Sequence, residues 1–254
     1  MLFEERQIKI REILEQKRSI RISELTKYLG ISKVTARKHL KILSDNIPIT
    51  LVRGGAIVKK EGTSYEPNYS TKSIKNVEIK EKIGILAASF VCDGETLLLD
   101  SGSTTWHVAN NLKGKIDITV ITNDIKISML LANTSGINTY FIGGKIRPFI
   151  FSSFGSIAEE FLKNFNVNKL FLGADAIDIE KGITNASAEE AKLKREMISS
   201  AQEVILVTDN TKFNKVSLAR TTDFSAIDCV ITDKSMPKEY EKIFYENKVK
   251  LIYV

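Results

Sequence analysis

The chain has 254 residues, of which 43% are hydrophobic and 27% are charged, and this composition is ordinary for a globular protein in water. No segment has the ~18 consecutive apolar residues that a membrane-spanning helix needs, and the charged N-terminus lacks the apolar core of a signal peptide. The two cysteines, Cys92 and Cys229, fit neither a disulfide framework nor a zinc-ligand spacing. We therefore expect a cytoplasmic protein with reduced core thiols and with no membrane contact, bound metal or cofactor.

Positive charge is concentrated in the first quarter of the chain. Residues 1–60 hold 14 basic and 6 acidic side chains, whereas residues 61–254 hold 23 basic and 25 acidic ones. A basic module joined to a near-neutral one is typical of a domain that binds a polyanion. A lysine-rich solvated surface has the same composition, so charge alone does not separate the two interpretations.

The N-terminal part has the pattern of a helix-turn-helix. Apolar residues at helical spacing predict a first helix over residues 4–16. We expect Ser23 to cap a second helix that stops at Gly30, and Ser32 to cap a third helix with Val34 on its apolar side. Two short helices joined by a turn that contains glycine form a helix-turn-helix.

A small β-hairpin and a loop-like stretch follow these helices. Branched residues and a Gly-Gly pair over residues 47–57 predict the hairpin, which would be the wing of a winged helix-turn-helix. The regular pattern is lost over residues 59–75, where Gly, Ser and Pro are typical of loops. The sequence therefore predicts one domain over residues 1–58, a linker over residues 59–75 and a second domain over residues 76–254.

Helical and strand patterns alternate in the second domain, which is typical of an α/β fold. Continuous apolar runs at residues 97–99 and 204–207 indicate strands that are covered on both faces, as in an open, largely parallel sheet. Helices are expected over residues 76–91, 107–112, 125–132, 157–164, 189–201 and 237–247. Strands are expected over residues 96–100, 118–122, 139–142, 169–173, 203–208, 229–232 and 249–254.

The third helix carries side chains that suit contact with double-stranded DNA. In a helix-turn-helix the second helix of the motif enters the major groove, and nearby cations hold phosphates. Arg37 is the best candidate for a bidentate contact to guanine, whereas Ser32 and Thr35 suit phosphate contacts or capping. The other candidates for DNA contact are Lys33, Lys38, His39, Lys41 and, in the wing, Arg53. A corner of two helices with a solvated basic face is the alternative.

Several motifs of the chain resemble those of DeoR-family bacterial transcription regulators. In the N-terminal part these are Leu29-Gly30-Ile31-Ser32, Val34-Thr35-Ala36-Arg37-Lys38 and Arg53-Gly54-Gly55-Ala56. Further on they are Asp100-Ser101-Gly102-Ser103-Thr104-Thr105, Thr122-Asn123, Ile142-Gly143-Gly144, Leu172-Gly173-Ala174-Asp175 and Asp209-Asn210-Thr211-Lys212-Phe213. The resemblance implies a winged helix-turn-helix followed by a sensor domain with the fold of sugar-phosphate isomerases.

Three residues depart from the pattern that this family usually has. Ala36 stands where the family has isoleucine or valine, His39 stands where it has aspartate, and Arg53 stands where it has histidine. The last two changes increase the positive charge that would face DNA, so a known operator sequence is not carried over. His39 is also open to a second interpretation, as a helix residue whose ring is satisfied by its neighbours.

A turn rich in Gly, Ser and Thr follows the buried run at residues 97–99. Such a turn at the start of a helix offers backbone amides and hydroxyls to a phosphate. Ligands of parallel sheets collect beyond the carboxyl ends of the strands, where further loops are expected. The candidate effector-binding residues are Asp100, Ser101, Gly102, Ser103, Thr104, Thr105, Asn123, Gly143, Gly144 and Asp175. Phosphate donors near carboxylates suit a phosphorylated sugar, although each loop alone would merely turn the chain.

Two lysines and two glutamates near these loops are assigned roles of their own. Lys194 and Lys212 suit neutralisation of a phosphate, with surface solvation as the alternative for each. Glu189 and Glu190 stand near a helix start, where acidic residues favour the helix dipole. Trp106 and His107 are expected to pack rather than bind.

The resemblance to isomerases raises the alternative that the second domain is an enzyme. The related ribose-phosphate isomerases have an Asp-Gly-Ala-Asp motif, and Leu172 replaces its first aspartate here. Proton transfer from a sugar needs a positioned base, so we expect no enzyme. The sequence therefore predicts a repressor of a sugar operon that binds operator DNA as a dimer or tetramer and responds to a phosphorylated sugar. The alternatives are a sugar-phosphate isomerase or deaminase fused to a DNA-binding head, and a transcriptional activator.

Overall fold

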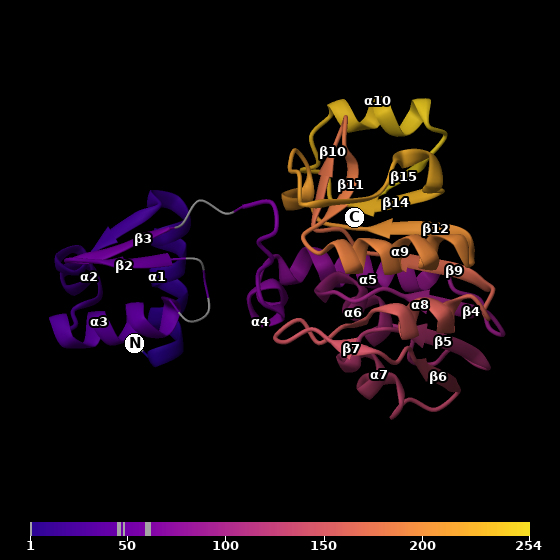
Figure 1. Ribbon diagram of the computed structural model, residues 1–254, viewed down its shortest axis with the longest axis horizontal. Coiled ribbons are helices and arrows are strands. Elements are labelled where there is room, and N and C mark those ends of the chain that lie inside the picture. The colour runs from indigo at the N-terminus through magenta and orange to yellow at the C-terminus, as the bar shows by residue number, and fades with distance from the viewer. Residues whose placement is uncertain (1, 45–46, 48, 59–61) are drawn as a thin grey trace. The chain divides into compact units, whose positions relative to one another are not determined.

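The computed structural model describes residues 2–44, 47, 49–58 and 62–254. The chain divides into two compact units, Met1–Gly62 and Thr63–Val254 (Figure 1). The linker expected over residues 59–75 is shorter in the structure, because residues from Thr63 onward bond to the second unit. The Thr63 carbonyl accepts a hydrogen bond from the Leu218 N–H at 2.9 Å, and the Tyr69 N–H donates to the Phe149 carbonyl at 2.9 Å. Residues 59–61 lie outside the described residues.

The first unit is a winged helix-turn-helix, as predicted. It contains helices α1 (Phe3–Lys17), α2 (Ile22–Leu29) and α3 (Lys33–Ser44) and an antiparallel sheet in the order β1 (Ser19–Arg21), β3 (Gly55–Val58) and β2 (Ile49–Val52). Fully buried side chains such as Leu14, Leu25 and Leu40 form its core. The glycine pair of the wing is required, because a Cβ on Gly55 would lie 2.1 Å from the Ile20 carbonyl oxygen.

The starts of α2 and α3 are fixed by different residues. Ser32 caps α3 as predicted, since its Oγ accepts a hydrogen bond from the Thr35 N–H at 3.1 Å. The prediction that Ser23 caps α2 is wrong, because Arg21 is the N-cap residue. Strand β1 ends at Arg21, and the Ile22 N–H donates to the Gly54 carbonyl at 2.7 Å, so the wing sets where α2 begins. The sequence pattern did not predict β1, which has only three residues.

The second unit is a seven-stranded parallel sheet between two layers of helices (Figure 1). The strand order is β15 (Lys250–Tyr253), β14 (Cys229–Thr232), β12 (Ala201–Val207), β9 (Val167–Leu172), β4 (Thr96–Leu99), β5 (Ile118–Thr122) and β6 (Ile137–Phe141), and every pairing is parallel. The helices are α4 (Tyr69–Ser73), α5 (Val77–Ser89), α6 (Ser103–Asn110), α7 (Ile125–Leu131), α8 (Ser156–Leu162), α9 (Ala188–Ser199) and α10 (Glu239–Glu246). The prediction of an α/β domain with a largely parallel sheet is confirmed.

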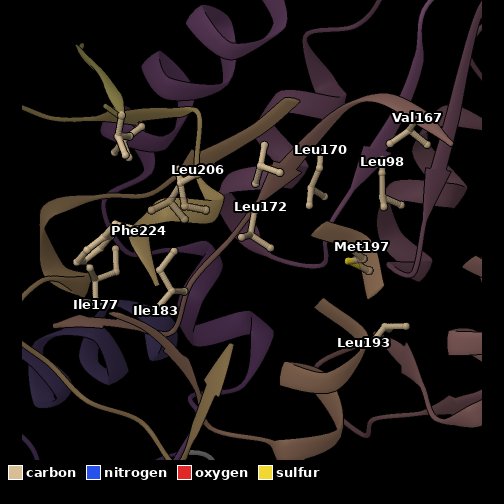
Figure 2. Packing of buried hydrophobic residues seen from close by; sticks show 14 of the residues in the cluster. Leu98, Val167, Leu170, Leu172, Ile177, Ile183, Leu193, Met197, Leu206 and Phe224 are labelled. Carbon is tan, nitrogen blue, oxygen red and sulfur yellow. The ribbon is translucent and has the colours of Figure 1, made fainter. Parts of the chain in front are cut away.

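Alternate residues of each central strand point into two separate cores. Leu98, Leu170 and Leu206 pack on one face, where Figure 2 shows them with Leu193 and Met197 of α9. Their sequence neighbours pack on the other face against α5, α6 and α7. Because both faces are covered, the strands are apolar without alternation, which is why the apolar runs predicted them. No helix in the described part of the chain has the length and apolar character to cross a membrane.

Two small antiparallel sheets were not predicted. One has the order β10 (Ala176–Asp178), β11 (Gly182–Asn185) and β13 (Ala219–Thr222), and the other pairs β7 (Lys145–Ile146) with β8 (Ser153–Phe154). These strands have two to four residues and carry polar side chains, so periodicity does not reveal them. The expectation of core thiols holds for Cys229, which is buried, but is wrong for Cys92, which is exposed in the turn before β4.

The strand order reverses at β4. From β4 the chain continues to β5 and β6 on one side and then returns to β9 on the other side. At such a switch point the loops that leave the two strands diverge and open a crevice at the carboxyl edge of the sheet. Here those loops are residues 100–102 and 173–175, which contain several of the residues expected to bind an effector.

Candidate functional site

A pocket lies at the switch point between β4 and β9. The pocket is narrow, with a cavity volume of about 30 Å³. Its lining includes Ser101, Gly102, Ser103, Thr104, Thr105, Asp175, Lys194 and Lys212, as expected, and also Lys72, Gly173, Ala174, Glu190, Val207 and Thr208. The structure thus brings eight of the expected effector-binding residues to one hollow.

The start of α6 forms one wall of the pocket. Gly102 is its N-cap residue, and the first N–H groups of a helix have no partner within the helix and carry the positive end of its dipole. The Ser101 hydroxyl is buried without a hydrogen-bond partner among the described residues. A helix N-terminus beside an unsatisfied buried hydroxyl is a site that suits an anion.

A buried ion pair joins the two loops beneath this wall. Asp100 is fully buried, and its Oδ2 accepts hydrogen bonds from the Gly173 N–H at 2.8 Å and from the Lys194 Nζ at 2.7 Å. Lys194 also donates to the Gly173 carbonyl at 2.8 Å. Burial raises the pKa of Asp100. Burial also opposes the charge of Lys194, but the charges of Asp100, Glu190 and Asp175 together outweigh it and raise the pKa of Lys194. Asp100 therefore supports the pocket instead of lining it, and Lys194 is not a solvated surface lysine.

Lys212 is the pocket cation without an ion-pair partner in the part of the chain that the structure describes. It ends the short helix η1 (Asn210–Lys212) that follows β12. The ammonium groups of Lys72 and Lys194, by contrast, each bond to a carboxylate. Burial and then the charge of Lys72 lower the pKa of Lys212. An anion in the pocket would relieve both effects.

Asp175 lies beside these cations as an ionised carboxylate. Its Oδ1 accepts from the Lys72 Nζ at 3.0 Å, and its Oδ2 accepts from the Asn185 Nδ2 and the Ala186 N–H, each at 3.1 Å. Burial opposes ionisation, but the charges of Lys72 and Lys212 outweigh it and hold the pKa of Asp175 below its usual range. This carboxylate is suited to accept hydrogen bonds from sugar hydroxyls.

A network of buried charges extends behind Asp175. Glu66 bonds to Lys72 at 2.6 Å and to Arg147, and Arg147 also bonds to Glu190. Burial raises the pKa of Glu190 to about 8. The interpretation of Glu190 as a helix-dipole residue is therefore incomplete, since its side chain is buried among charges. Its neighbour Glu189 is exposed at the start of α9, where an acidic side chain favours the helix dipole.

Three carboxylates of this network lie close enough together to hold a metal ion. Oxygen atoms of Glu66, Asp175 and Glu190 all lie within 4.8 Å of one another. However, Lys72 bonds to the first two of them, and Arg147 bonds to Glu66 and Glu190. Protein cations therefore supply the positive charge that a metal would otherwise supply.

Three expected residues lie at the same sheet edge but do not line the pocket. Asn123 is buried, and its Nδ2 donates to the Ser153 carbonyl at 3.1 Å. Gly143 and Gly144 lead into the β7–β8 hairpin, and a Cβ on Gly144 would lie 2.6 Å from the Phe154 carbonyl oxygen. These three residues are therefore outside the pocket lining, and Asn123 and Gly144 contact the hairpin.

Trp106 and His107 pack, as expected. Trp106 is half-buried against the core beneath α6, and the backbone of His107 touches α5 at Gly84, where an added Cβ would lie 2.6 Å from the His107 carbonyl.

The exposed face of α3 carries most of the side chains expected to contact DNA. Ser32, Lys33, Arg37, Lys38 and Lys41 are exposed on α3 or at its start, Thr35 is half-buried, and Arg53 is exposed at the turn of the wing. These residues are therefore presented as the predicted DNA surface requires.

Two predictions about α3 are wrong. Val34 is 74% exposed, so it does not belong to the apolar side. His39 is 1% exposed, stacks on the Phe3 ring at 4.7 Å and bonds to the Gln7 Nε2 at 2.8 Å. Burial against α1 prevents His39 from reaching a base edge in this structure, so its interpretation as a packed helix residue is the correct one. Burial also lowers the pKa of His39.

The chain matches two family descriptions that together span most of its length. Residues 6–61 match the DeoR-like helix-turn-helix domain, and residues 75–234 match the DeoR C terminal sensor domain. It is 34% identical to the HTH-type transcriptional repressor GlcR of Bacillus subtilis over 99% of this chain and 96% of that protein. It is 32% identical to the transcriptional repressor AccR of Agrobacterium fabrum over 95% of this chain and 96% of that protein. Among solved structures, ribose 5-phosphate isomerase A of Methanocaldococcus jannaschii is 19% identical over 55% of each chain, with a TM-score of 0.41.

Proposed function

The chain belongs to the DeoR family of transcriptional regulators, and from this premise we propose that it is a repressor whose affinity for DNA is set by a phosphorylated sugar. The observation that carries this proposal is the pocket at the carboxyl ends of β4 and β9. Lys212 lines this pocket together with the N-terminus of α6 and Ser101. Among the described residues, the Lys212 ammonium group has no ion-pair partner and the buried Ser101 hydroxyl has no hydrogen-bond partner.

The proposed effector binds with its phosphate at α6 and its sugar toward Asp175. Backbone N–H groups of the first turn and the hydroxyls of Ser103 and Thr104 suit the phosphate oxygens. Lys212 supplies a charge-assisted bond, which is the strong kind of hydrogen bond. Asp175, which lines the same pocket, then accepts bonds from sugar hydroxyls.

The proposed DNA contacts come from the first two turns of α3 and from the wing. In this proposal Arg37 bonds a guanine, while Lys33, Lys38 and Arg53 neutralise phosphates; all four residues are exposed. Helix-turn-helix proteins gain affinity by binding two half-sites as dimers, so we propose a homo-oligomer. The effector lowers DNA affinity if it binds more tightly to the state that does not fit the operator.

We do not propose sugar turnover. Leu172 is fully buried in β9, so an apolar side chain stands where the isomerase motif has its first aspartate. Incubation with ribose 5-phosphate, followed by detection of ribulose 5-phosphate, tests this directly: no conversion is expected.

Calorimetric titration of the full chain tests the effector site. The panel is ribose 5-phosphate, glucose 6-phosphate, fructose 6-phosphate and glycerol 3-phosphate, each paired with its dephosphorylated form. At least one phosphorylated compound should bind, its dephosphorylated form should not, and Lys212→Met should weaken binding by about tenfold or more, since a hydrogen bond to a charged group is lost. Lys234→Met, at an exposed lysine outside the pocket lining, is the control. Equal binding by both forms of every compound would refute the phosphate site.

A further inference from the structure

The segment that follows the DNA-binding unit in sequence supplies a side chain to the effector pocket. Lys72 lies on α4 and lines the pocket together with Lys212. Its ammonium group bonds to the Glu66 Oε1 at 2.6 Å and to the Asp175 Oδ1 at 3.0 Å. One cation of the pocket therefore comes from residues 63–73, ahead of the parallel sheet in the chain.

The backbone around Lys72 is held independently of its side chain. Lys80 of α5 is buried, and its Nζ donates to the carbonyls of Lys72 and Lys75 at 2.5 and 2.6 Å. The Tyr69 N–H bonds to the Phe149 carbonyl at the other end of α4. The ammonium group of Lys72 can therefore change partners while α4 stays in place.

Carboxylates attract Lys72 and Lys212 repels it. Burial opposes the charge of Lys72, but the charges of Asp175, Glu66 and Glu190 together outweigh burial and raise the pKa of Lys72. Lys72 and Lys212 face one hollow, and after burial the charge of Lys72 is the largest cause that lowers the pKa of Lys212. An anion between the two ammonium groups replaces this repulsion by two attractions. Glu66 keeps a second partner in Arg147, so it is not left as an unpaired buried charge when Lys72 turns to the anion.

We propose that Lys72 is a further ligand of the phosphorylated effector, and that the anion competes with Glu66 for its ammonium group. This proposal rests on the proposed effector site and adds its regulation: occupancy changes the ion pairs of residues 63–73, which follow directly on the DNA-binding unit in the chain.

The proposal predicts opposite effects of two substitutions on one affinity. Binding of inorganic phosphate to the full chain is followed by the fluorescence of Trp106, the single tryptophan of the chain, in the first turn of α6. Lys72→Met should weaken phosphate binding by about tenfold or more, because a charge-assisted bond is lost. Glu66→Gln should tighten it, because the competitor for Lys72 loses its charge. If the network is only structural, both substitutions weaken binding, and the proposal is wrong.

A double-mutant cycle separates a direct contact from a general effect of charge. The gain from Glu66→Gln should vanish in the Lys72→Met background, whereas a long-range electrostatic effect would persist there. Glu189→Gln, which removes an exposed acidic charge nearby on α9, should leave phosphate affinity unchanged. If Lys72→Met does not fold, the comparison of Glu66→Gln with Glu189→Gln decides, and equal effects of the two overturn the proposal.

The same titrations distinguish this proposal from the one on which it rests. If wild type binds phosphate and Lys212→Met weakens it but Lys72→Met does not, the effector site stands and the role of Lys72 is refuted. If wild type binds no phosphate, both are refuted. The DNA affinity of Lys72→Met should also respond less to ribose 5-phosphate than that of wild type, when each is saturated with it.

Discussion

Removal of Lys194 should destabilise the sensor unit far more than removal of a lysine two residues away. The side chains of Lys194 and Asp100 are 3% and 0% exposed, and their atoms lie 2.7 Å apart. Lys194→Met leaves the Asp100 carboxylate buried without a cation, held by backbone N–H groups such as that of Gly173. Breaking a buried pair in this way costs about 3–5 kcal/mol of the free energy of unfolding.

Lys192→Met is the matched control on the same helix. Lys192 also has a carboxylate partner at 2.7 Å, Glu159, but its side chain is 59% exposed. The Glu159 side chain is 12% exposed, so the pair is open to solvent mainly on the lysine side, and we expect it to contribute about 1 kcal/mol. The contrast between the two variants therefore isolates burial, since helix, residue type and partner type are shared.

Urea unfolding followed by Trp106 fluorescence measures the difference. Trp106 lies in the sensor unit, so the signal reports that unit without the DNA-binding unit. The loss of unfolding free energy in Lys194→Met should shrink as the pH falls. Burial raises the pKa of Asp100 and the Lys194 charge lowers it, so in the variant Asp100 takes up a proton at higher pH than in wild type. A raised carboxyl pKa gives stability at low pH that is lost as the pH rises. If Lys194→Met and Lys192→Met lose unfolding free energies that agree within about 1 kcal/mol, the buried Lys194–Asp100 pair does not stabilise the sensor unit as proposed.

Three further predictions concern packing, pH and DNA. Gly84→Ala should lower stability by about 1–3 kcal/mol through overpacking, because its Cβ would meet the His107 backbone. Gly143→Ala, also in the sensor unit, meets nothing within 4 Å and should be neutral in the same urea assay. Burial raises the pKa of Glu190 from 4.5 to about 8, so the free energy of unfolding of wild type should fall as the pH rises from about 4.5 to about 8. Glu190→Gln should remove this part of the pH dependence. Identical pH profiles of wild type and Glu190→Gln would contradict this. Arg37→Ala should reduce the preference for a selected duplex over a random one in gel-shift titrations, by about 1–3 kcal/mol for each guanine that Arg37 bonds, and an unchanged preference would rule out that bond.

The fold could be predicted where burial leaves a continuous or periodic trace in the sequence. The apolar runs at residues 97–99 and 204–207 revealed β4 and β12 because both faces of the sheet are covered. Val34 was misplaced although the helical period contains the answer: Ala36, Leu40 and Leu43 lie on one stripe and are buried, and Val34 faces away from it.

The phosphate wall of the site was predictable, but the charges behind it were not. Residues 101–105 are adjacent in sequence and carry the chemistry of an anion site in their composition. By contrast, Glu66 bonds to Arg147, which is 81 residues away in the sequence, and Lys72 bonds to Asp175, which is 103 residues away. Such distant pairs leave no local sequence pattern. The burial of His39 likewise depends on α1, because Phe3 and Gln7 cover its ring.

Reciprocal linkage between DNA and sugar phosphate tests most directly whether the pocket controls DNA binding. The affinity of the full chain for a duplex selected from a random pool is measured by fluorescence anisotropy, with and without a saturating concentration of the sugar phosphate that binds most tightly in the panel. We expect this compound to weaken DNA binding by about 5–150-fold, and DNA to weaken its binding by the same factor. Equal DNA affinity in its presence and absence, at saturation of the pocket, would mean that the pocket does not regulate the DNA-binding unit.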